Sequence, residues 1–248
     1  MRTKKTLLAS MLVVALFLTS NGIAQEAAKK TYGMVEISYM LPKIGMEKAF
    51  VSGVKAHNDK YHKEGVHKAH LDNVLTGREA GWYVWAMGPC TLTDLDSRPG
   101  KGAHADDWTK NIAPTIARYG RVEYWRYNDK LSHQSDATES KYQELWIIDL
   151  KRGDYYRFKA LMTKIQAAYV KKGSGNIGVY DNRFASNDGR EVAIVWDYKN
   201  WAAFDEEGGG IKKEFEEING EGSWENAMDE WTEITESIKR EVWEHDVK

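Results

Sequence analysis

Hydrophobic and polar positions alternate along several short segments of the chain, which predicts β-strands separated by helices. The first such segment is 34–41, in which Val35 and Ile37 share one face. From Met46 onward, apolar positions recur every three or four residues, which predicts a helix that ends near Gly65. Further strands are expected at 66–76, 82–87 and 121–127, with a broken helical region at 91–119.

The same order of elements is predicted again in the second half of the chain. Its strands are expected at 144–150, 177–184, 191–198 and 240–245, with a helix ended by Gly173 and a broken helical region at 201–239, interrupted at 208–210. Residue matches in the same order indicate an internal duplication, because chance does not align so many. The matched pairs include Phe50 and Phe158, Tyr61 and Tyr169, Gly65 and Gly173, Trp85 and Trp196, and Trp125 and Trp243.

Each half therefore has the order β-α-β-β-α-β, which is the ferredoxin-like motif. Helices cover one face of such a sheet, and the other face needs a partner, which a second repeat can supply by packing sheet to sheet. We predict an α+β fold in which two ferredoxin-like repeats form one pseudo-dimeric α/β barrel. The repeats are assigned to 32–128 and 141–248, joined by a polar linker at 129–140.

This element order, the duplication and the tryptophans on the strands resemble the dimeric α/β-barrel superfamily in its tandem form. That superfamily includes antibiotic-biosynthesis-type monooxygenases, stress-responsive barrel proteins and haem-binding chlorite-dismutase-like proteins. The resemblance covers 32–246 and implies the fold rather than one function, because no catalytic signature accompanies it. In the haem-binding members, the proximal histidine comes from the second repeat. This chain offers only His245 there, so we expect no haem and no other cofactor.

The first 24 residues have the three-part layout of a secretory signal peptide. A basic segment at 2–5 precedes a mostly apolar run at 7–18, and small residues at 22–24 suit cleavage before Gln25. Twelve residues span about 18 Å as a helix, which is short of the ~30 Å hydrocarbon core of a bilayer. We therefore expect a periplasmic or secreted protein without membrane insertion.

Composition narrows the classes of partner. The 248 residues include 10 Trp, 13 Tyr and 6 Phe, enough aromatic surface for a substantial core. Loss of the three basic signal residues would lower the formal net charge from −2 to −5, which disfavours nucleic acid as a partner. The single cysteine, Cys90, excludes an internal disulfide. We expect a monomer or homodimer that binds a small molecule.

Histidines are the most informative chemical groups, because five of the seven lie in the first half: His57, His62, His67, His70 and His104. His70 and Asp72 are two apart on a predicted strand, so they point to the same side. A neighbouring aspartate can fix the tautomer of a histidine and raise its pKa, which suits proton transfer. His57 lies on the apolar stripe of the first helix, either as a base facing a pocket or as a hydrogen-bonded core histidine. The candidate catalytic residues are His57, His70 and Asp72, and the candidate substrate-binding residues are Asn58, Tyr61, His62, Tyr83 and Trp85.

A metal site built from His57, His62, His67 and His70 is an alternative, because neutral imidazole is the commonest metal ligand. The spacing matches no metal signature, and a strand would direct His67 and His70 to opposite faces. We therefore predict no metal site.

The predicted function is the binding of a small apolar or aromatic molecule inside the barrel. The protein would be a cofactor-independent monooxygenase or isomerase in which a histidine of the first half abstracts a proton. The alternative is a non-catalytic ligand carrier or a protein-interaction module. An open pocket in which polar side chains converge would favour the enzyme, and a pocket filled by tryptophan would favour the alternative.

Overall fold

The computed structural model describes residues 32–135, 140–186, 188–205 and 210–247. The predicted signal peptide at 1–24 lies outside the described residues, as does most of the predicted break at 208–210. Among the helices in the described ranges, none is both long and apolar enough to cross a lipid bilayer.

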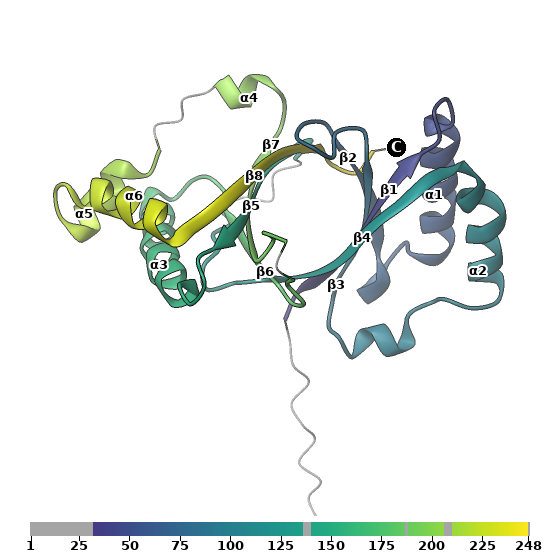
Figure 1. Ribbon diagram of the computed structural model, residues 1–248, viewed down its shortest axis with the longest axis horizontal. Helices are drawn as coiled ribbons and strands as arrows, with labels where there is room; N and C mark the ends of the chain where they lie inside the picture. The colour runs from purple at the N-terminus through teal and green to yellow at the C-terminus, as the bar shows by residue number, and fades with distance from the viewer. Residues whose placement is uncertain (1–31, 136–139, 187, 206–209, 248) are drawn as a thin grey trace, which may run out of the picture. The chain divides into compact units, whose positions relative to one another are not determined.

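Eight antiparallel strands form a closed barrel in the order β1-β3-β2-β8-β5-β7-β6-β4 (Figure 1). The strands are β1 Met34–Pro42, β2 Ala69–Val74, β3 Tyr83–Cys90, β4 Ile116–Tyr127, β5 Tyr142–Leu150, β6 Gly178–Asn182, β7 Val192–Tyr198 and β8 Thr235–Glu244. Each half of the chain supplies four adjacent strands, and the halves meet where β2 pairs with β8 and β4 pairs with β6. Closure of the ring leaves no open sheet edge.

The helices lie on the outside of the barrel (Figure 1). They are α1 Glu47–Tyr61, α2 Ala103–Asp107, α3 Tyr155–Lys172, α4 Ala202–Asp205, α5 Lys212–Asn219 and α6 Ser223–Ile234. The segment Trp108–Ile112 continues α2 as a π-helix, and short 3₁₀ helices occupy Gly65–His67, Asp94–Ser97 and Ala113–Thr115. The helix α3 ends as predicted at Gly173, whose φ of 69° is the left-handed conformation that glycine adopts readily.

Side chains alternate between the barrel interior and the helix side of each strand, so the core has separate parts. Both halves contribute to the interior, where the buried residues include Ile37, Tyr39, Trp125, Leu145 and Trp243. Each half also packs its strands against its own helices. These outer cores include Phe50, Val54, Trp85 and Ile112 in the first half, and Phe158, Met162, Ile165 and Phe215 in the second. The interior core therefore draws its buried residues from strands of both halves.

All eight strands lie close to their predicted positions, but several boundaries differ. Strands β4 and β8 begin at Ile116 and Thr235, earlier than the predicted 121 and 240. The sequence pattern misses their first residues because these are mostly exposed and show little apolar alternation. Strand β2 begins at Ala69, since the preceding residues form a 3₁₀ helix. Within the predicted linker 129–140, His133 forms an isolated antiparallel bridge with Ile177.

Candidate functional site

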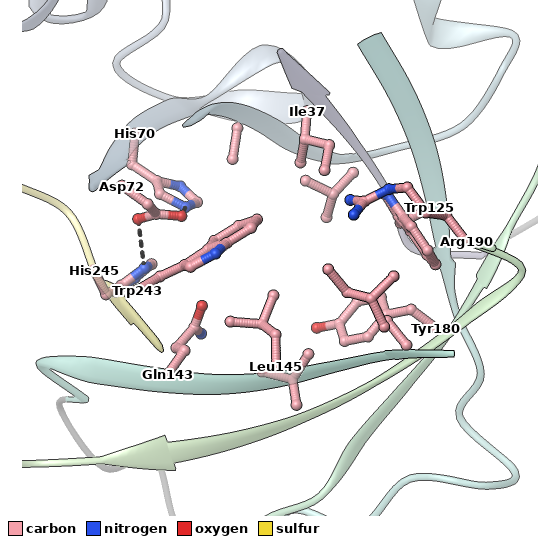
Figure 2. Close-up of a pocket in the computed structure, with 15 residues that line it drawn as sticks. Ile37, His70, Asp72, Trp125, Gln143, Leu145, Tyr180, Arg190, Trp243 and His245 are labelled. Carbon is pink, nitrogen blue, oxygen red and sulfur yellow. Dashed lines mark hydrogen bonds and ion pairs between the residues drawn. The ribbon is translucent and has the colours of Figure 1, made fainter. Parts of the chain in front are cut away.

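The barrel encloses a cavity of about 260 Å³ that is lined by strands of both halves. Most of its wall is apolar or aromatic and includes Val35, Ile37, Trp125, Leu145, Ile147, Val195 and Trp243. Polar side chains gather at two places in this wall, and Figure 2 shows His70, Asp72 and His245 across the cavity from Arg190. The cavity thus offers an apolar chamber with a different polar group at each of two sides.

The first polar group, the histidine–aspartate group, consists of His70, Asp72 and His245. The Nε2 atom of His70 lies 3.3 Å from Oδ2 of Asp72, and Nδ1 of His245 lies 3.0 Å from Oδ1. Oδ1 also accepts the backbone N–H of Asp246 at 2.9 Å. The carboxylate is buried between the two imidazoles, whose ring centroids are 4.6 Å apart.

Two strands from opposite halves of the chain assemble this group. Alternation along β2 places His70 and Asp72 on the same face, as predicted, and that face lines the barrel cavity. His245 directly follows β8, which pairs with β2, and the chain continues beside β2, where the Val247 N–H donates to the Leu71 carbonyl. Pairing between the first and second halves therefore completes the site.

Opposing effects set the protonation of the histidine–aspartate group. Burial acts to raise the pKa of Asp72, but the His70 charge and the hydrogen bonds from both histidines hold it well below its usual range. Burial acts to lower the pKa of His245, but the hydrogen bond and charge of Asp72 raise it. An imidazole held by a carboxylate in this way is suited to general acid–base chemistry.

The second polar group in the cavity is the buried guanidinium of Arg190. Its Nε donates to Glu123 Oε1 at 2.6 Å, and its Nη2 donates to Glu123 Oε2 at 2.9 Å and to the Tyr39 hydroxyl at 3.0 Å. Burial acts to lower the pKa of Arg190, but the hydrogen bond with Glu123 raises it, so the side chain stays protonated. The bidentate pair fixes the guanidinium at the cavity wall.

A further cluster, the three-histidine cluster, lies outside the barrel between α1 and α2. The Nε2 atom of His104 is 3.1 Å from that of His57 and 3.0 Å from that of His62. All three rings line a second cavity of about 340 Å³. Burial lowers the pKa of His62 to about 4, and burial together with the neighbouring His57 lowers that of His104.

The structure separates the residues that the sequence suggests as one site. Of the eight predicted residues, all of which the structure describes, only His70 and Asp72 line the barrel cavity. The others lie in α1, at the residue that follows it, or on the helix-facing side or end of β3, because α1 covers the outside of the barrel. They are His57, Asn58, Tyr61, His62, Tyr83 and Trp85.

Several of these outer residues have structural partners. The indole N–H of Trp85 donates to Asn58 Oδ1 at 2.9 Å, and the Asn58 amide donates to the Ala69 carbonyl at 3.4 Å. The Tyr61 hydroxyl donates to the Ala103 carbonyl at 2.9 Å. The Tyr83 ring meets Phe50 edge to face, with centroids 5.3 Å apart. These contacts join α1 to the barrel and to α2, away from the barrel cavity.

Sequence reasoning missed His245, Arg190 and His104 as site residues. The duplication held one usable signal, since Arg190 belongs to a Gly-Arg-Glu turn that matches residues 77–79 of the first half. His245 becomes part of the site through the pairing of β2 with β8, which no local pattern encodes. His104 lies in the broken helical region, where periodicity gives no direction for a side chain.

Comparison with known proteins adds the fold context. No protein-family model and no curated protein sequence matches the chain. Among solved structures, a proposed monooxygenase from Lactobacillus acidophilus is similar, with a TM-score of 0.57, 14% identity and coverage of 88% of this chain and 95% of that chain. The chain has the dimeric α/β-barrel fold.

Two further solved structures share this fold. A proposed monooxygenase from Fusobacterium nucleatum has a TM-score of 0.54 at 11% identity, with coverage of 88% of this chain and 94% of that chain. An anthrone oxidase-like protein has a TM-score of 0.52 at 7% identity, with coverage of 87% and 92%. At identities this low, structural similarity establishes the fold alone. The roles of individual residues must therefore be argued from the geometry of this chain.

Proposed function

We propose that the barrel cavity binds a small apolar or aromatic molecule and that the histidine–aspartate group removes a proton from it. The observation that carries this proposal is the carboxylate-linked pair of histidines facing an otherwise mostly apolar cavity. The open space with converging polar side chains supports an enzyme over a carrier filled by tryptophan. The monooxygenase and anthrone oxidase-like proteins of the same fold support oxidation as the reaction class.

Anthrone illustrates the chemistry that this cavity suits. It is a flat aromatic ketone whose methylene group is acidic, because the enolate formed on deprotonation is aromatic. That enolate can reduce O₂ itself. One oxygen atom becomes the new carbonyl, and the other leaves as water with both methylene hydrogens. The histidine–aspartate group would accept the first proton, and the Arg190 guanidinium would stabilise the oxyanion across the cavity.

We also propose that the two halves are tandem ferredoxin-like repeats and that the protein is exported. The ring of strands supports the repeats, because β4-β1-β3-β2 and β8-β5-β7-β6 place equivalent strands in equivalent order. The signal-like segment at 1–24 supports export to the periplasm or the medium. Mass spectrometry of protein recovered from the periplasm tests export, with a mature chain that begins at Gln25 as the expected result.

The decisive test of the reaction uses anthrone as the probe and Asp72→Asn as the variant. We expect wild-type protein to convert anthrone to anthraquinone with uptake of one O₂ per turnover. Asp72→Asn should lower the rate by about 10²–10⁴-fold, the usual contribution of general acid–base catalysis. His133→Gln, which alters a histidine outside both histidine groups, is the matched control and should retain the rate.

Three outcomes would count against the proposal. Equal rates in wild type and Asp72→Asn would remove the histidine–aspartate group from the reaction. Binding of anthrone without any oxidation above buffer would favour the ligand-carrier alternative, and absence of both would exclude this aromatic ketone as a representative ligand.

A further inference from the structure

Three imidazole nitrogens converge outside the barrel, away from the proposed reaction site. The Nε2 atoms of His57 and His62 each lie within 3.1 Å of Nε2 of His104. The ligand atoms of the three histidines all lie within 4.8 Å of one another. His57 and His62 are almost fully buried, with 1% and 2% of their surface exposed. Such close approach of three nitrogen atoms needs something that holds them together.

Hydrogen bonds at the Nδ1 atoms of His57 and His62 determine whether their Nε2 atoms direct a hydrogen or a lone pair towards His104. Nδ1 of His57 lies 2.7 Å from the Asp107 carboxylate, and Nδ1 of His62 lies 2.8 Å from the His67 carbonyl. Both partners are acceptors, so both Nδ1 atoms carry hydrogen and donate. In the neutral rings, the Nε2 atoms of His57 and His62 therefore direct lone pairs towards His104.

His104 cannot satisfy both lone pairs without help. If its Nε2 carries the ring hydrogen, that hydrogen can point at one neighbour and leaves the other nitrogen facing it unpaired. If its Nδ1 carries the hydrogen, three lone pairs meet, and this buried Nδ1 has no hydrogen-bond partner among the described residues. A cation at the centre removes the conflict, since it accepts all three lone pairs.

We propose that His57, His62 and His104 form a binding site for a divalent first-row transition-metal ion, with Zn²⁺ as the representative. Metal–nitrogen bonds of ~2.0–2.1 Å in a tetrahedral site place the ligand nitrogens about 3.3 Å apart. The two Nε2 separations from His104, 3.1 Å to His57 and 3.0 Å to His62, are already close to this value. The second cavity, which all three rings line, leaves a fourth position for water or an exchangeable ligand.

The surroundings of the three-histidine cluster match those of protein metal sites. Metal-binding histidines commonly donate their second N–H to a carboxylate or a backbone carbonyl, which fixes ring orientation and strengthens the ligand. Asp107 and the His67 carbonyl do this for His57 and His62. Asp107 is itself held by the Asn111 side-chain amide at 2.9 Å. These contacts align the ligands in advance.

Local chain geometry explains how these three residues meet. Residues five apart on a continuous helix point about 140° away from each other, so His57 and His62 would diverge on an unbroken α1. The helix instead ends at Tyr61, and the φ of −134° at His62 turns its side chain back. His104 and Asp107 are three apart on α2, which allows one helix face to supply both a ligand and a supporting carboxylate.

The histidine–aspartate group in the barrel is the competing location for an ion. Its three side chains also lie within 4.8 Å of one another. There, however, the carboxylate between the rings already accepts the histidine and backbone hydrogens, so no set of free lone pairs converges. Zn²⁺ binding to Asp72→Asn distinguishes the two locations, because this variant alters the group in the barrel and leaves the three-histidine cluster intact.

The experiment measures Zn²⁺ binding to chelator-treated protein by competition with a chromophoric chelator. We expect one tightly bound Zn²⁺ per wild-type chain and a higher unfolding temperature with Zn²⁺ than without it. Removal of an outer-shell partner typically lowers metal affinity by about 10–100-fold. His104→Ala removes a ligand itself, so its Zn²⁺ affinity should fall by more than this. Asp72→Asn and the matched control His133→Ala should retain wild-type affinity. Circular dichroism verifies folding, and His57→Gln serves as a second ligand variant.

Each alternative outcome would overturn the proposal. Absence of Zn²⁺ binding at micromolar concentration by folded wild-type protein would exclude the site. Retention of tight binding by both folded ligand variants would do the same. Loss of binding in Asp72→Asn with retention in His104→Ala would move the ion into the barrel. Because none of these measurements uses anthrone turnover, failure of the proposed function and failure of the metal site remain distinguishable.

Discussion

Two histidine groups of this protein, one inside the barrel and one outside it, contain similar side chains but arrange them differently. In the barrel, the Asp72 carboxylate lies between two imidazoles and accepts from both. Outside the barrel, the Asp107 carboxylate lies behind His57, and the nitrogen atoms of three imidazoles face one another. The first arrangement suits the proton transfer proposed above, whereas the second suits the proposed cation, because its lone pairs converge. The position of the carboxylate, rather than the number of histidines, separates the two chemistries.

The barrel interior also contains a buried ion pair. Arg190 and Glu123 are buried and joined by two hydrogen bonds, and the Trp125 indole N–H donates to the same carboxylate at 3.0 Å. In both polar groups of the cavity, a buried carboxylate therefore meets a nitrogen donor directly. In the three-histidine cluster the Asp107 carboxylate lies behind the His57 ring.

The largest effect on stability is expected when the Arg190–Glu123 pair is broken. Arg190→Leu leaves Glu123 as an uncompensated buried charge and should lower the free energy of unfolding by about 3–5 kcal/mol. Urea denaturation followed by tryptophan fluorescence measures the change. The double variant Arg190→Leu with Glu123→Leu should recover part of the loss, because the Glu123 charge is removed with its partner while the buried Glu241 still loses the favourable charge of Arg190. If Arg190→Leu lowers the free energy of unfolding by less than about 1 kcal/mol, Glu123 does not depend on Arg190 to compensate its buried charge.

A smaller effect is expected from the carboxylate behind the three-histidine cluster. Asp107→Asn keeps the shape of the side chain but removes the charge that supports the His57 ring. We expect Zn²⁺ affinity to fall by about 10–100-fold, which corresponds to about 1.4–2.7 kcal/mol. The same competition titration measures it, with Asp106→Asn on the adjacent exposed position as the control. Equal Zn²⁺ affinity in Asp107→Asn and Asp106→Asn would mean that the Asp107 charge does not support His57 as a metal ligand.

The sequence allows prediction of features that depend on local periodicity. Alternation along β2 correctly places His70 and Asp72 together on one face, and spacing along α1 correctly places His57 on a buried stripe. Repetition of the element order also predicts the eight strands. These features need only a few neighbouring residues, so one sequence suffices.

The remaining features depend on contacts between distant segments. His245 reaches Asp72 because β8 pairs with β2, and 173 residues separate the two partners in the chain. His104 reaches His57 because α2 packs beside α1, across 47 residues. The sequence places His57 on a buried face but does not show whether that face meets the barrel interior or an outer helix. Consequently the candidate residues divide between two sites.

The smallest expected effect is the pH dependence that the histidine–aspartate group adds to stability. The raised pKa of His245 makes its contribution complete below its unfolded pKa, and the contribution is lost as pH rises through the folded pKa. The lowered pKa of Asp72 makes its contribution complete above its unfolded pKa, and it is lost as pH falls towards the folded pKa. The two contributions overlap between about pH 4 and pH 6.5, the ordinary pKa values of the two side chains.

His245→Gln should therefore destabilise the protein more at about pH 5.5 than at about pH 8.5. The difference should stay below about 1 kcal/mol, since the histidine is partly exposed and solvent screens the pair. Urea denaturation of both proteins at the two pH values measures it. Asp246 and Asp197 also raise the pKa of His245, so Asp72→Asn should reduce the pH dependence without abolishing it. A destabilisation by His245→Gln that grows with pH would reverse the sign and show that the His245 imidazole is held neutral, the form that the lowered pKa values of His62 and His104 favour.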